Sequence, residues 1–290
     1  MTEDLLVVST PVDLETWEEI SELVAAASAK DSISYARIFS VENLKDPHYY
    51  GFCILAYHSE TDELVGFASA VDPLNTRDYE WSIMVHPDKR SKELGVRIYE
   101  RLVEEFEKRD FMSQTAMNAS NSPHSAAFLK KLGYQYAYSE RTMKALPKAV
   151  EMDEGLRIEK YREDQDRETL EGIIENAFGD SKEEVEALIE FTQYAPNRQF
   201  FLAWGEDTAL GAMTIVHEHE KIWVTALAVH SMARGQGVAS NLLRFAQQYA
   251  FDQGVKSIYL DVETDNEQAL SIYERVGFQT VNHTKYWKLT

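Results

Sequence analysis

The feature of this sequence that most limits its fold is an internal repeat with a constant offset of 144 residues. The segments "VHPDKRSKELGV" at 85–96 and "VHSMARGQGVAS" at 229–240 begin alike, and their arginines, Arg90 and Arg234, obey 234 − 90 = 144. The same offset relates the glycines of "KKLGYQ" and "ERVGFQ" further along the chain. Because any net insertion would shift this register, its persistence predicts two copies of one domain.

Both copies carry the same order of predicted elements. Each opens with a short strand and an acidic amphipathic helix, "LETWEEISELVAAA" or "RETLEGIIENAF". A strand-turn-strand unit follows, "GFCILAYHSETDELVGFASAV" or "FFLAWGEDTALGAMTIV". After the repeated loop, apolar residues recur at the spacing of one helix face. These residues are Leu94, Ile98, Tyr99, Leu102 and Phe106 in one copy and Val238, Leu242, Leu243, Ala246 and Ala250 in the other.

The length of the chain agrees with this division. At about 150 residues per domain, 290 residues suggest roughly two domains. The stretch "ALPKAVEMDEG", at 145–155, is the natural boundary between them. We therefore predict an α/β (α+β) fold with domains at 1–148 and 149–290.

Charge and composition exclude several functions. The net charge of −20 argues against nonspecific binding to nucleic acid or anionic membranes, because that binding needs basic patches. No apolar run reaches about 18 residues, so no transmembrane helix is expected. The acidic start "MTEDLLVVST" lacks the features of a secretory signal. Cys53 is the only cysteine and is interpreted as a small apolar strand residue. We therefore expect neither an intrachain disulfide nor a Cys-based zinc site, and we expect a cytoplasmic location.

The glycines of the second loop indicate a ligand site. Gly235 and Gly237 allow the backbone to approach a ligand without an intervening Cβ. The N–H groups of the following helical turn then face that ligand, with the positive end of the helix dipole behind them. This arrangement suits a pyrophosphate, and Arg234 can add a charged donor. The alternative is a tight strand-to-helix turn without a ligand, and the segment matches neither a dinucleotide fingerprint nor a phosphate loop.

The context of this loop resembles a known family. "LAVHSMARGQGVASNLL", "SIYLDV" and "NEQALSIYERVGF" contain R-x-x-G-x-A at 234–239 and N-x-x-A-x-x-x-Y-x-x-x-G-F at 266–278. Together they resemble the GCN5-related N-acetyltransferase (GNAT) superfamily, which binds acetyl-CoA. The resemblance implies tandem domains, each a mixed, mostly antiparallel sheet with a splayed parallel strand pair and flanking helices. It also implies acetyl transfer from acetyl-CoA, without a metal, to a primary amine of a small molecule or a peptide.

The resemblance assigns roles to individual residues. Leu227, Ala228 and Val229 would supply backbone groups to the pantetheine arm, and Asn266 would hydrogen-bond its amides. Tyr273 would lie near the sulfur and protonate the departing thiolate as a general acid; the alternative is a core aromatic residue. The pyrophosphate would be held by Arg234, Gly235, Gln236, Gly237, Val238, Ala239 and Ser240.

One element of the family pattern is missing. Many members place a glutamate on the strand that leads into the loop, but no carboxylate lies between Trp223 and Val229. Residues that could act as a base through water are Glu218, His219, Glu220, Asp261 and Glu263, and none stands out. "HEHE" at 217–220 looks like a metal cluster but is interpreted as an exposed polar hairpin. The absent glutamate leaves a noncatalytic acyl-CoA sensor or scaffold as a rival function. A separate alternative is an N-acetyltransferase that acts on a protein or peptide instead of a small amine.

The first copy has lost the residues that carry this chemistry. A glutamate beside a bound phosphate adds a repulsion of about 4 kcal/mol at about 4 Å and an effective dielectric constant of about 20. We therefore predict a degenerate GNAT-like domain with a structural or substrate-shaping role. The replacements, at the offset of 144, are Ser91 for Gly235, Glu93 for Gly237, Gly95 for Ala239, Ser122 for Asn266 and Leu129 for Tyr273.

Overall fold

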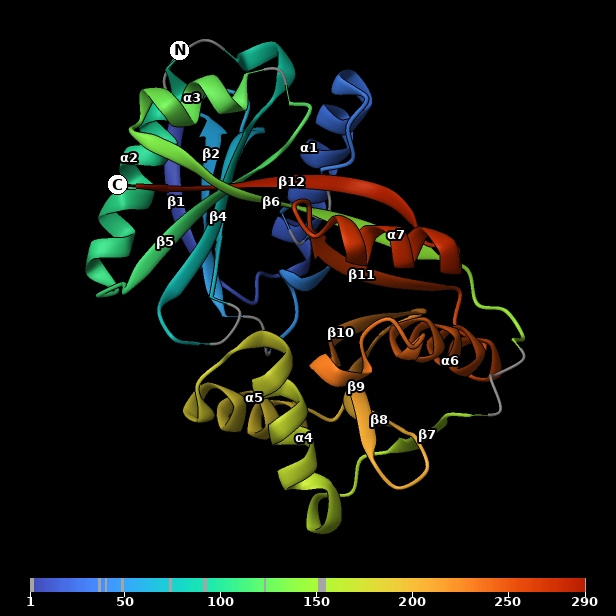
Figure 1. Cartoon of the computed structure of the whole chain (residues 1–290). Helices are drawn as coiled ribbons and strands as arrows, with labels where there is room; N and C mark the ends of the chain where they lie inside the picture. Colours follow the sequence, from blue (N-terminus) through green and yellow to red (C-terminus); the bar gives the residue numbers. More distant parts are fainter. Residues whose placement is uncertain are drawn as a thin grey trace. The chain divides into compact units, whose positions relative to one another are not determined.

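The computed structural model describes residues 3–35, 38–39, 41–47, 50–72, 75–90, 93–122, 124–150 and 155–289 (Figure 1). The chain forms two compact units. Unit 1 comprises Met1–Glu140 with Asn282–Thr290, and unit 2 comprises Arg141–Val281. The division into domains at 1–148 and 149–290 stays a prediction; the compact units differ from it by assigning 141–148 to unit 2 and 282–290 to unit 1.

Unit 1 is built on a mixed sheet with strand order β1-β2-β3-β4-β5-β12-β6. β4 and β5 pair in parallel. Successive strands from β1 to β4 pair antiparallel, and β12 pairs antiparallel with β5. Its elements are β1 (Glu3–Ser9), α1 (Leu14–Asp31), β2 (Gly51–His58), β3 (Leu64–Val71), β4 (Asp78–Val85), α2 (Leu94–Lys108), β5 (Ser113–Ala119), α3 (Ser125–Lys131), part of β6 (Tyr134–Ala145) and part of β12 (Gln279–Leu289).

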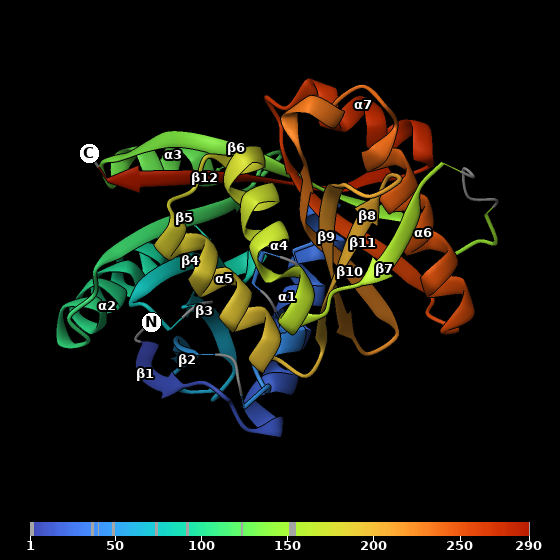
Figure 2. The ribbon, with the colours of Figure 1, turned by 60° about the horizontal axis from the view of Figure 1, so that its bottom comes forward.

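Unit 2 repeats this pattern with strand order β11-β10-β9-β8-β7 (Figures 1 and 2). β10 and β11 pair in parallel and the other neighbours antiparallel, so the predicted mixed fold class is confirmed. Its elements are β7 (Arg157–Lys160), α4 (Glu163–Phe178), α5 (Lys182–Tyr194), β8 (Arg198–Trp204), β9 (Ala209–Glu218), β10 (Lys221–Val229), α6 (Val238–Asp252), β11 (Ser257–Glu263) and α7 (Glu267–Val276).

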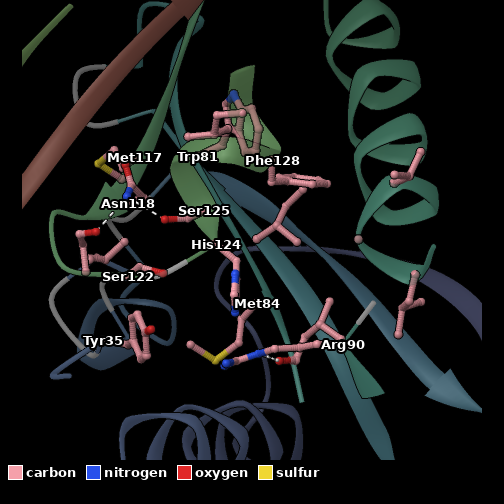
Figure 3. A pocket seen from close by; sticks show the side chains of 18 of the residues that line it. Tyr35, Trp81, Met84, Arg90, Met117, Asn118, Ser122, His124, Ser125 and Phe128 are labelled. Carbon is pink, nitrogen blue, oxygen red and sulfur yellow. Dashed lines mark hydrogen bonds between the residues drawn. The ribbon is translucent and has the colours of Figure 1, made fainter. Parts of the chain in front are cut away.

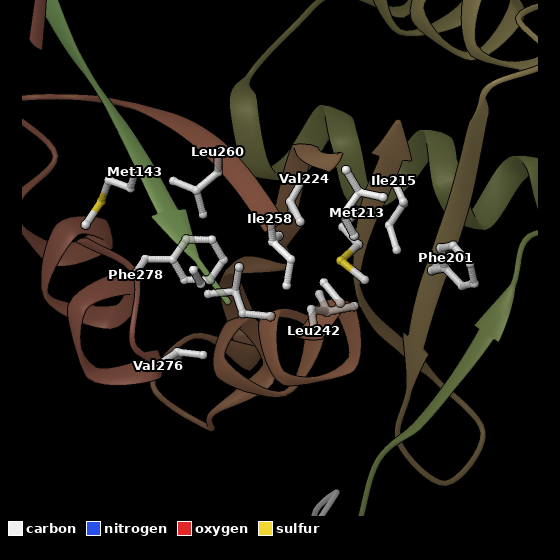
Figure 4. Close-up of a cluster of buried hydrophobic side chains, with 14 of the residues drawn as sticks. Met143, Phe201, Met213, Ile215, Val224, Leu242, Ile258, Leu260, Val276 and Phe278 are labelled. Atoms are coloured by element: carbon white, nitrogen blue, oxygen red, sulfur yellow. The ribbon is translucent and has the colours of Figure 1, made fainter. Parts of the chain in front are cut away.

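The sheet of unit 2 carries helices on both faces. α6 and α7 pack on one face against alternate strand residues such as Ile215, Ile222 and Val224 (Figure 4). α4 and α5 pack on the opposite face against Phe200 and Leu202. The predicted apolar stripe of α6 is buried in the first of these layers: Val238, Leu242, Leu243, Ala246 and Ala250 are at most 2% exposed.

Unit 1 is layered in the same way. Cys53 and Leu55 of β2 face α1, whereas Phe52, Ile54 and Ala56 face α2. Burial raises the pKa of the Cys53 thiol to about 12, so it is a core residue of the strand, as predicted, and not a thiolate nucleophile. Within the described residues, none of the helices combines the length and apolar character needed to cross a membrane.

Two strands each begin in one unit and end in the other. Arg141–Ala145 of β6 belong to unit 2, where Met143 and Ala145 are buried in the core beneath α6 and α7. Asn282–Leu289 of β12 belong to unit 1. There β12 pairs with β5, and the buried Trp287 indole donates a hydrogen bond to Asn118 Oδ1. Each unit is therefore completed by a segment from beyond the predicted boundary.

A fragment of residues 151–290 is expected to be insoluble or much less stable when it is expressed alone. It lacks the buried Met143 and Ala145, and its last strand lacks β5 as a partner. Soluble yield and thermal unfolding followed by circular dichroism test this expectation. Coexpression with residues 1–150 is the control, because it restores both missing segments. A lone fragment that melts like the full chain and keeps full activity would contradict the mutual dependence of the two halves.

Candidate functional site

The parallel strands of unit 2 separate as they approach the glycine loop. β10 and β11 pair at Lys221–Trp223 and Ser257–Tyr259, and their ladder ends there. A bulge follows in β10 between Thr225 and Ala228, with Ala226 at a φ of +47°. A positive φ is uncommon for a residue with a Cβ, and bulges are frequent beside functional sites. The predicted splayed strand pair is therefore present, and it opens directly ahead of the loop.

The loop itself presents unoccupied backbone donors. Gly235 and Gly237 adopt left-handed conformations, with φ of +78° and +82°, which glycine reaches at no steric cost. α6 starts immediately after Gly237, and in this described segment no side chain caps its first turn. The N–H groups of that turn therefore remain available to an anion, at the positive end of the helix dipole.

A cavity of about 520 Å³ opens at this helix end, wholly within unit 2. Two predicted residues do not line it: Ala228 is buried in the ladder beside Ala212, and the Gln236 side chain donates to the Met232 carbonyl. The roles of all predicted residues stay predictions. Those that line the cavity are Leu227, Val229, Arg234, Gly235, Gly237, Val238, Ala239, Ser240, Asn266 and Tyr273.

The charge of the cavity differs from that of the whole chain. Arg234 and Arg275 line it, and none of its described lining residues is acidic. The Arg234 guanidinium makes one long contact, 3.4 Å from Nη2 to the carbonyl oxygen of Ala177. A local positive charge in a chain of net charge −20 indicates a site for an anionic ligand.

Two polar side chains stand along the α7 wall of the cavity. Asn266 caps α7, with its Oδ1 accepting from the Ala269 N–H at 3.1 Å, so its Nδ2 is the group left for a ligand. Burial raises the pKa of the Tyr273 phenol to about 12. Among the described residues its hydroxyl has no hydrogen-bond partner. The alternative of a core aromatic residue also stays open, because the Tyr273 ring packs against the unit 2 core and contacts Phe278.

Several lining residues were missed from the sequence. Gln268, Ala269, Ile272 and Arg275 share one face of α7 with Tyr273, and their spacing of three and four residues could have identified them. Three others carry no local sequence signal, because they reach the cavity through the fold of the chain. These are Ala177 and Phe178 at the end of α4 and Ala233 before the loop.

None of the described carboxylates considered as a base lines the cavity. Glu218 accepts a hydrogen bond from the Trp223 indole at 2.9 Å. Glu220 pairs with Lys256 at 2.6 Å between Nζ and Oε1. Asp261 accepts from the Thr142 hydroxyl. His219 occupies the hairpin turn at a φ of +51°, and Glu263 is exposed.

The "HEHE" hairpin is stabilised by contacts of its own. His217 Nε2 shares a hydrogen bond with the Tyr249 hydroxyl at 3.0 Å. The Glu218 carboxylate forms an ion pair with Lys221, with 3.5 Å between Oε2 and Nζ. In the part of the chain that the structure describes, no three His, Cys, Asp or Glu side chains gather in a group that could hold a metal ion.

Unit 1 keeps a cavity of about 420 Å³ at the repeat-equivalent position, with different chemistry (Figure 3). Glu93 precedes α2 at a φ of +63°, the conformation that Gly237 adopts in unit 2. Arg90, the counterpart of Arg234, forms two hydrogen bonds with the Asp31 carboxylate, at 2.8 and 2.7 Å. Ser91, the predicted counterpart of Gly235, lies outside the described residues.

Curated proteins similar to this chain are acetyltransferases. The chain is 37% identical over 67 residues to GCN5-related N-acetyltransferase 6, chloroplastic, of Arabidopsis thaliana. The aligned segment covers 23% of each protein. It is 35% identical over 83 residues to N-alpha-acetyltransferase 30 of Schizosaccharomyces pombe, covering 27% of this chain and 55% of that protein. The chain thus spans less than two thirds of the length of these two relatives. It is 24% identical to mycothiol acetyltransferase of Corynebacterium aurimucosum, with 96% and 97% of the two chains covered.

Solved structures share the fold along the whole chain. A GCN5-related N-acetyltransferase from Sphaerobacter thermophilus superposes with a TM-score of 0.77 at 18% identity, covering 98% of this chain and 94% of that one. A tandem GNAT protein from the clavulanic acid biosynthesis pathway gives 0.68 at 16% identity, covering 98% of both. At these identities the likeness concerns the fold alone.

The two halves also match one family separately. Residues 15–134 and residues 160–278 each match the Acetyltransferase (GNAT) family. These ranges contain the repeated loop of each half and the helix that follows it. Since the two matches together cover most of the sequence, the chain belongs to the GNAT acetyltransferase family, as a member with two tandem copies of the fold.

Proposed function

We propose that unit 2 transfers an acetyl group from acetyl-CoA to a primary amine. The observation that carries this proposal is the start of α6, which has no side-chain cap and opens on the cavity. Arg234 and the two left-handed glycines, Gly235 and Gly237, directly precede it and line the same cavity. Backbone N–H groups and a guanidinium at a helix N-terminus are the donors that a pyrophosphate requires. Tyr273 lines the same cavity, so the proposed general acid and the proposed phosphate site belong to one space.

The residues of unit 2 fit the parts of acetyl-CoA. Gly235, Gly237 and the first turn of α6 would hold the pyrophosphate by their backbone N–H groups, and Arg234 by its guanidinium; the N–H groups of Arg234 and Gln236 already donate within the loop. The backbone groups of 227–229 that face β11, beyond the end of the parallel ladder, would hold the pantetheine amides. Asn266 Nδ2 would donate to a pantetheine carbonyl from the other wall. The thioester supplies the activated acetyl group, and the protein supplies its orientation.

The chemistry is a direct transfer. The amine nitrogen forms a bond to the acetyl carbon while the carbon–sulfur bond breaks. Tyr273 donates its phenolic proton to the departing sulfur. The amine nitrogen loses one proton to solvent, and solvent returns one proton to the tyrosine. Because the pKa of Tyr273 is raised to about 12, the phenol is in the protonated, donating form at neutral pH.

A noncatalytic acyl-CoA sensor remains the second candidate. It is favoured by the absence of a carboxylate among the described lining residues of the cavity. The acceptor class is also open to test, because one relative of the chain is an N-alpha-acetyltransferase. We therefore consider both a small amine and a peptide N-terminus as acceptors. The proposed location of the reaction is the cytoplasm.

Turnover with a panel of acceptors tests the proposed function. The full chain is mixed with acetyl-CoA and polyamines, amino sugars, amino acid amides or short peptides, and free thiol is measured. We expect amine-dependent thiol release with at least one class, and the class identifies the acceptor. Tight acetyl-CoA binding without amine-dependent release across the whole panel would establish the sensor instead.

The pH dependence of turnover gives a further prediction. A group whose pKa is raised to about 12 stays protonated throughout the neutral and moderately alkaline range. The rate is therefore expected to rise with pH as the acceptor amine loses its proton, and to show no decline from loss of the tyrosine donor below about pH 10. A profile of kcat between about pH 6 and pH 10 tests this, and a decline centred near pH 8 would contradict Tyr273 as the donor.

A further inference from the structure

The cavity of unit 1 is open at a mouth, as that of unit 2 is, but its lining differs from that of unit 2. Its volume of about 420 Å³ falls within the range of about 300 to 1,000 Å³ typical of small-molecule sites. Tyr35, Trp81 and Met84 line it and are buried, and Phe128 closes it from α3 (Figure 3). The space is therefore built from side chains of several elements of one unit.

The phosphate-binding end of this cavity is closed to phosphate. The Asp31 carboxylate accepts two hydrogen bonds from Arg90 and a third from the Tyr35 hydroxyl, at 2.8 Å. The Arg90 guanidinium holds the pKa of Asp31 below its usual value, so the carboxylate stays charged and neutralises the arginine. Glu93 adds a negative charge directly at the start of α2. An incoming phosphate would therefore meet a neutralised arginine and a like charge.

The slot that would receive a pantetheine arm is also bridged in unit 1. The Ser82 hydroxyl of β4 donates to the Met117 carbonyl of β5 at 3.0 Å, across the separating strands. In unit 2 the repeat-equivalent residue is Ala226, which has no hydroxyl and lies in the bulge. β4 also pairs with β3 in a regular register from Glu80 to Val85, without the bulge that β10 has between Thr225 and Ala228.

The interior of the cavity has little need of a polar ligand. Leu129 occupies the position of Tyr273. Asn118 is buried and already satisfied: its Nδ2 donates to Ser125 Oγ and to a backbone carbonyl, and its Oδ1 accepts from the Trp287 indole. The wall that Trp81, Ile83 and Phe128 form favours apolar groups, because a polar group there would lose water without gaining a partner. Ser122 and the exposed His124 also line the cavity and can meet a polar end of the ligand. Charged side chains stand at the mouth, where Lys89 and Lys131 join Glu93.

We propose that unit 1 binds a small, largely apolar molecule without phosphate groups. Its aromatic or branched aliphatic body packs against Trp81, Ile83 and Phe128, which line the cavity on one face of the sheet, and any polar end stays at the mouth of the cavity. This proposal concerns unit 1 alone and does not rest on the function proposed for unit 2. It adds a separate small-molecule site to the structural or substrate-shaping role predicted for the first copy.

Indole is a suitable probe, because it is aromatic, uncharged and free of phosphate. Titration calorimetry of the full chain at millimolar indole is expected to give one site. Saturating coenzyme A should leave that site unchanged, since the two ligands would occupy different units. Absence of indole binding, or displacement of indole by coenzyme A, would overturn the proposal.

Cavity-filling variants locate the indole site. Gly95 on α2 faces the cavity, and a Cβ there would meet the Phe128 ring at 3.5 Å, an ordinary contact. Gly95→Leu is therefore expected to fill the space and weaken indole binding at least tenfold. Gly172→Leu is the matched control, because Gly172 also lies within a helix, α4 of unit 2, and an added Cβ meets nothing within 4 Å. Its indole affinity should equal that of the unmodified chain.

A second variant protects the test against a folding defect. Val96→Phe fills the same cavity from the neighbouring lining position. Thermal unfolding identifies which of the two variants melts within a few degrees of the unmodified chain, and indole binding must be weakened in that variant. Unchanged binding in a stably folded Gly95→Leu or Val96→Phe protein would show that indole binds elsewhere.

Discussion

Gly237→Glu is expected to abolish measurable acetyl-CoA binding while leaving the fold intact. An added Cβ at Gly237 meets its nearest neighbour, Asn241 Nδ2, at 3.7 Å, an ordinary contact. A side chain at this left-handed position costs about 1 to 2 kcal/mol, and unit 1 accommodates Glu93 in the same conformation. The new carboxylate beside a phosphate costs about 4 kcal/mol at about 4 Å. That is about a thousandfold in affinity, measurable by calorimetry.

Gly237→Gln separates charge from shape in this experiment. It adds the same number of side-chain atoms at the same φ but no negative charge. We expect its affinity for acetyl-CoA to fall much less than that of Gly237→Glu. Equal losses in the two variants would mean that steric blocking dominates. Unchanged affinity in Gly237→Glu, with the thermal unfolding of both proteins intact, would show that the phosphate does not bind at α6.

Tyr273→Phe is expected to lower the maximal rate by about 10² to 10⁴. The ring and its packing against Phe278 remain, and only the hydroxyl is removed. Acetyl-CoA affinity should change little, because the loop at 234–240 is untouched. A tyrosine that served only as a core aromatic residue would instead preserve turnover, because the ring is kept in this variant. Rate and binding are measured with an acceptor from the panel, or with slow acetyl-CoA hydrolysis where an acceptor is still lacking.

Tyr249→Phe provides the matched control for this substitution. Tyr249 also lies on a helix of unit 2, but its hydroxyl bonds to His217 and it does not line the cavity. Its removal should leave the maximal rate unchanged. If Tyr273→Phe stays within about twofold of the unmodified enzyme, the acid is water or another residue and Tyr273 has only a packing role.

The sequence predicts the parts of this structure that depend on local chemistry. The left-handed loop follows from Gly235 and Gly237, since glycine is the residue that reaches that conformation without strain. The buried stripes of α2 and α6 follow from apolar spacing, because side chains four residues apart share a helix face. The constant offset of 144 residues then predicts the position of each element in one copy from its position in the other.

What the sequence does not predict depends on which segments meet in space. β12 pairs with β5 in unit 1, but nothing in the sequence of β12 identifies that partner. The Arg90–Asp31 pair joins residues far apart in the chain, and Phe178 reaches the unit 2 cavity from α4. The bulge at Ala226 was also missed, because the strained residue is not a glycine.

Titration calorimetry of the full chain with acetyl-CoA tests the central claim most directly. Among the described residues, neither α2 nor α6 has a side-chain cap at its start. The two differ in what precedes them: two left-handed glycines and Arg234 in unit 2, but Glu93 and an arginine neutralised by Asp31 in unit 1. The account predicts one strong site per chain, and predicts that Gly237→Glu removes it. Two equivalent sites per chain, or one site that survives Gly237→Glu in a folded protein, would contradict the assignment of acetyl-CoA to unit 2.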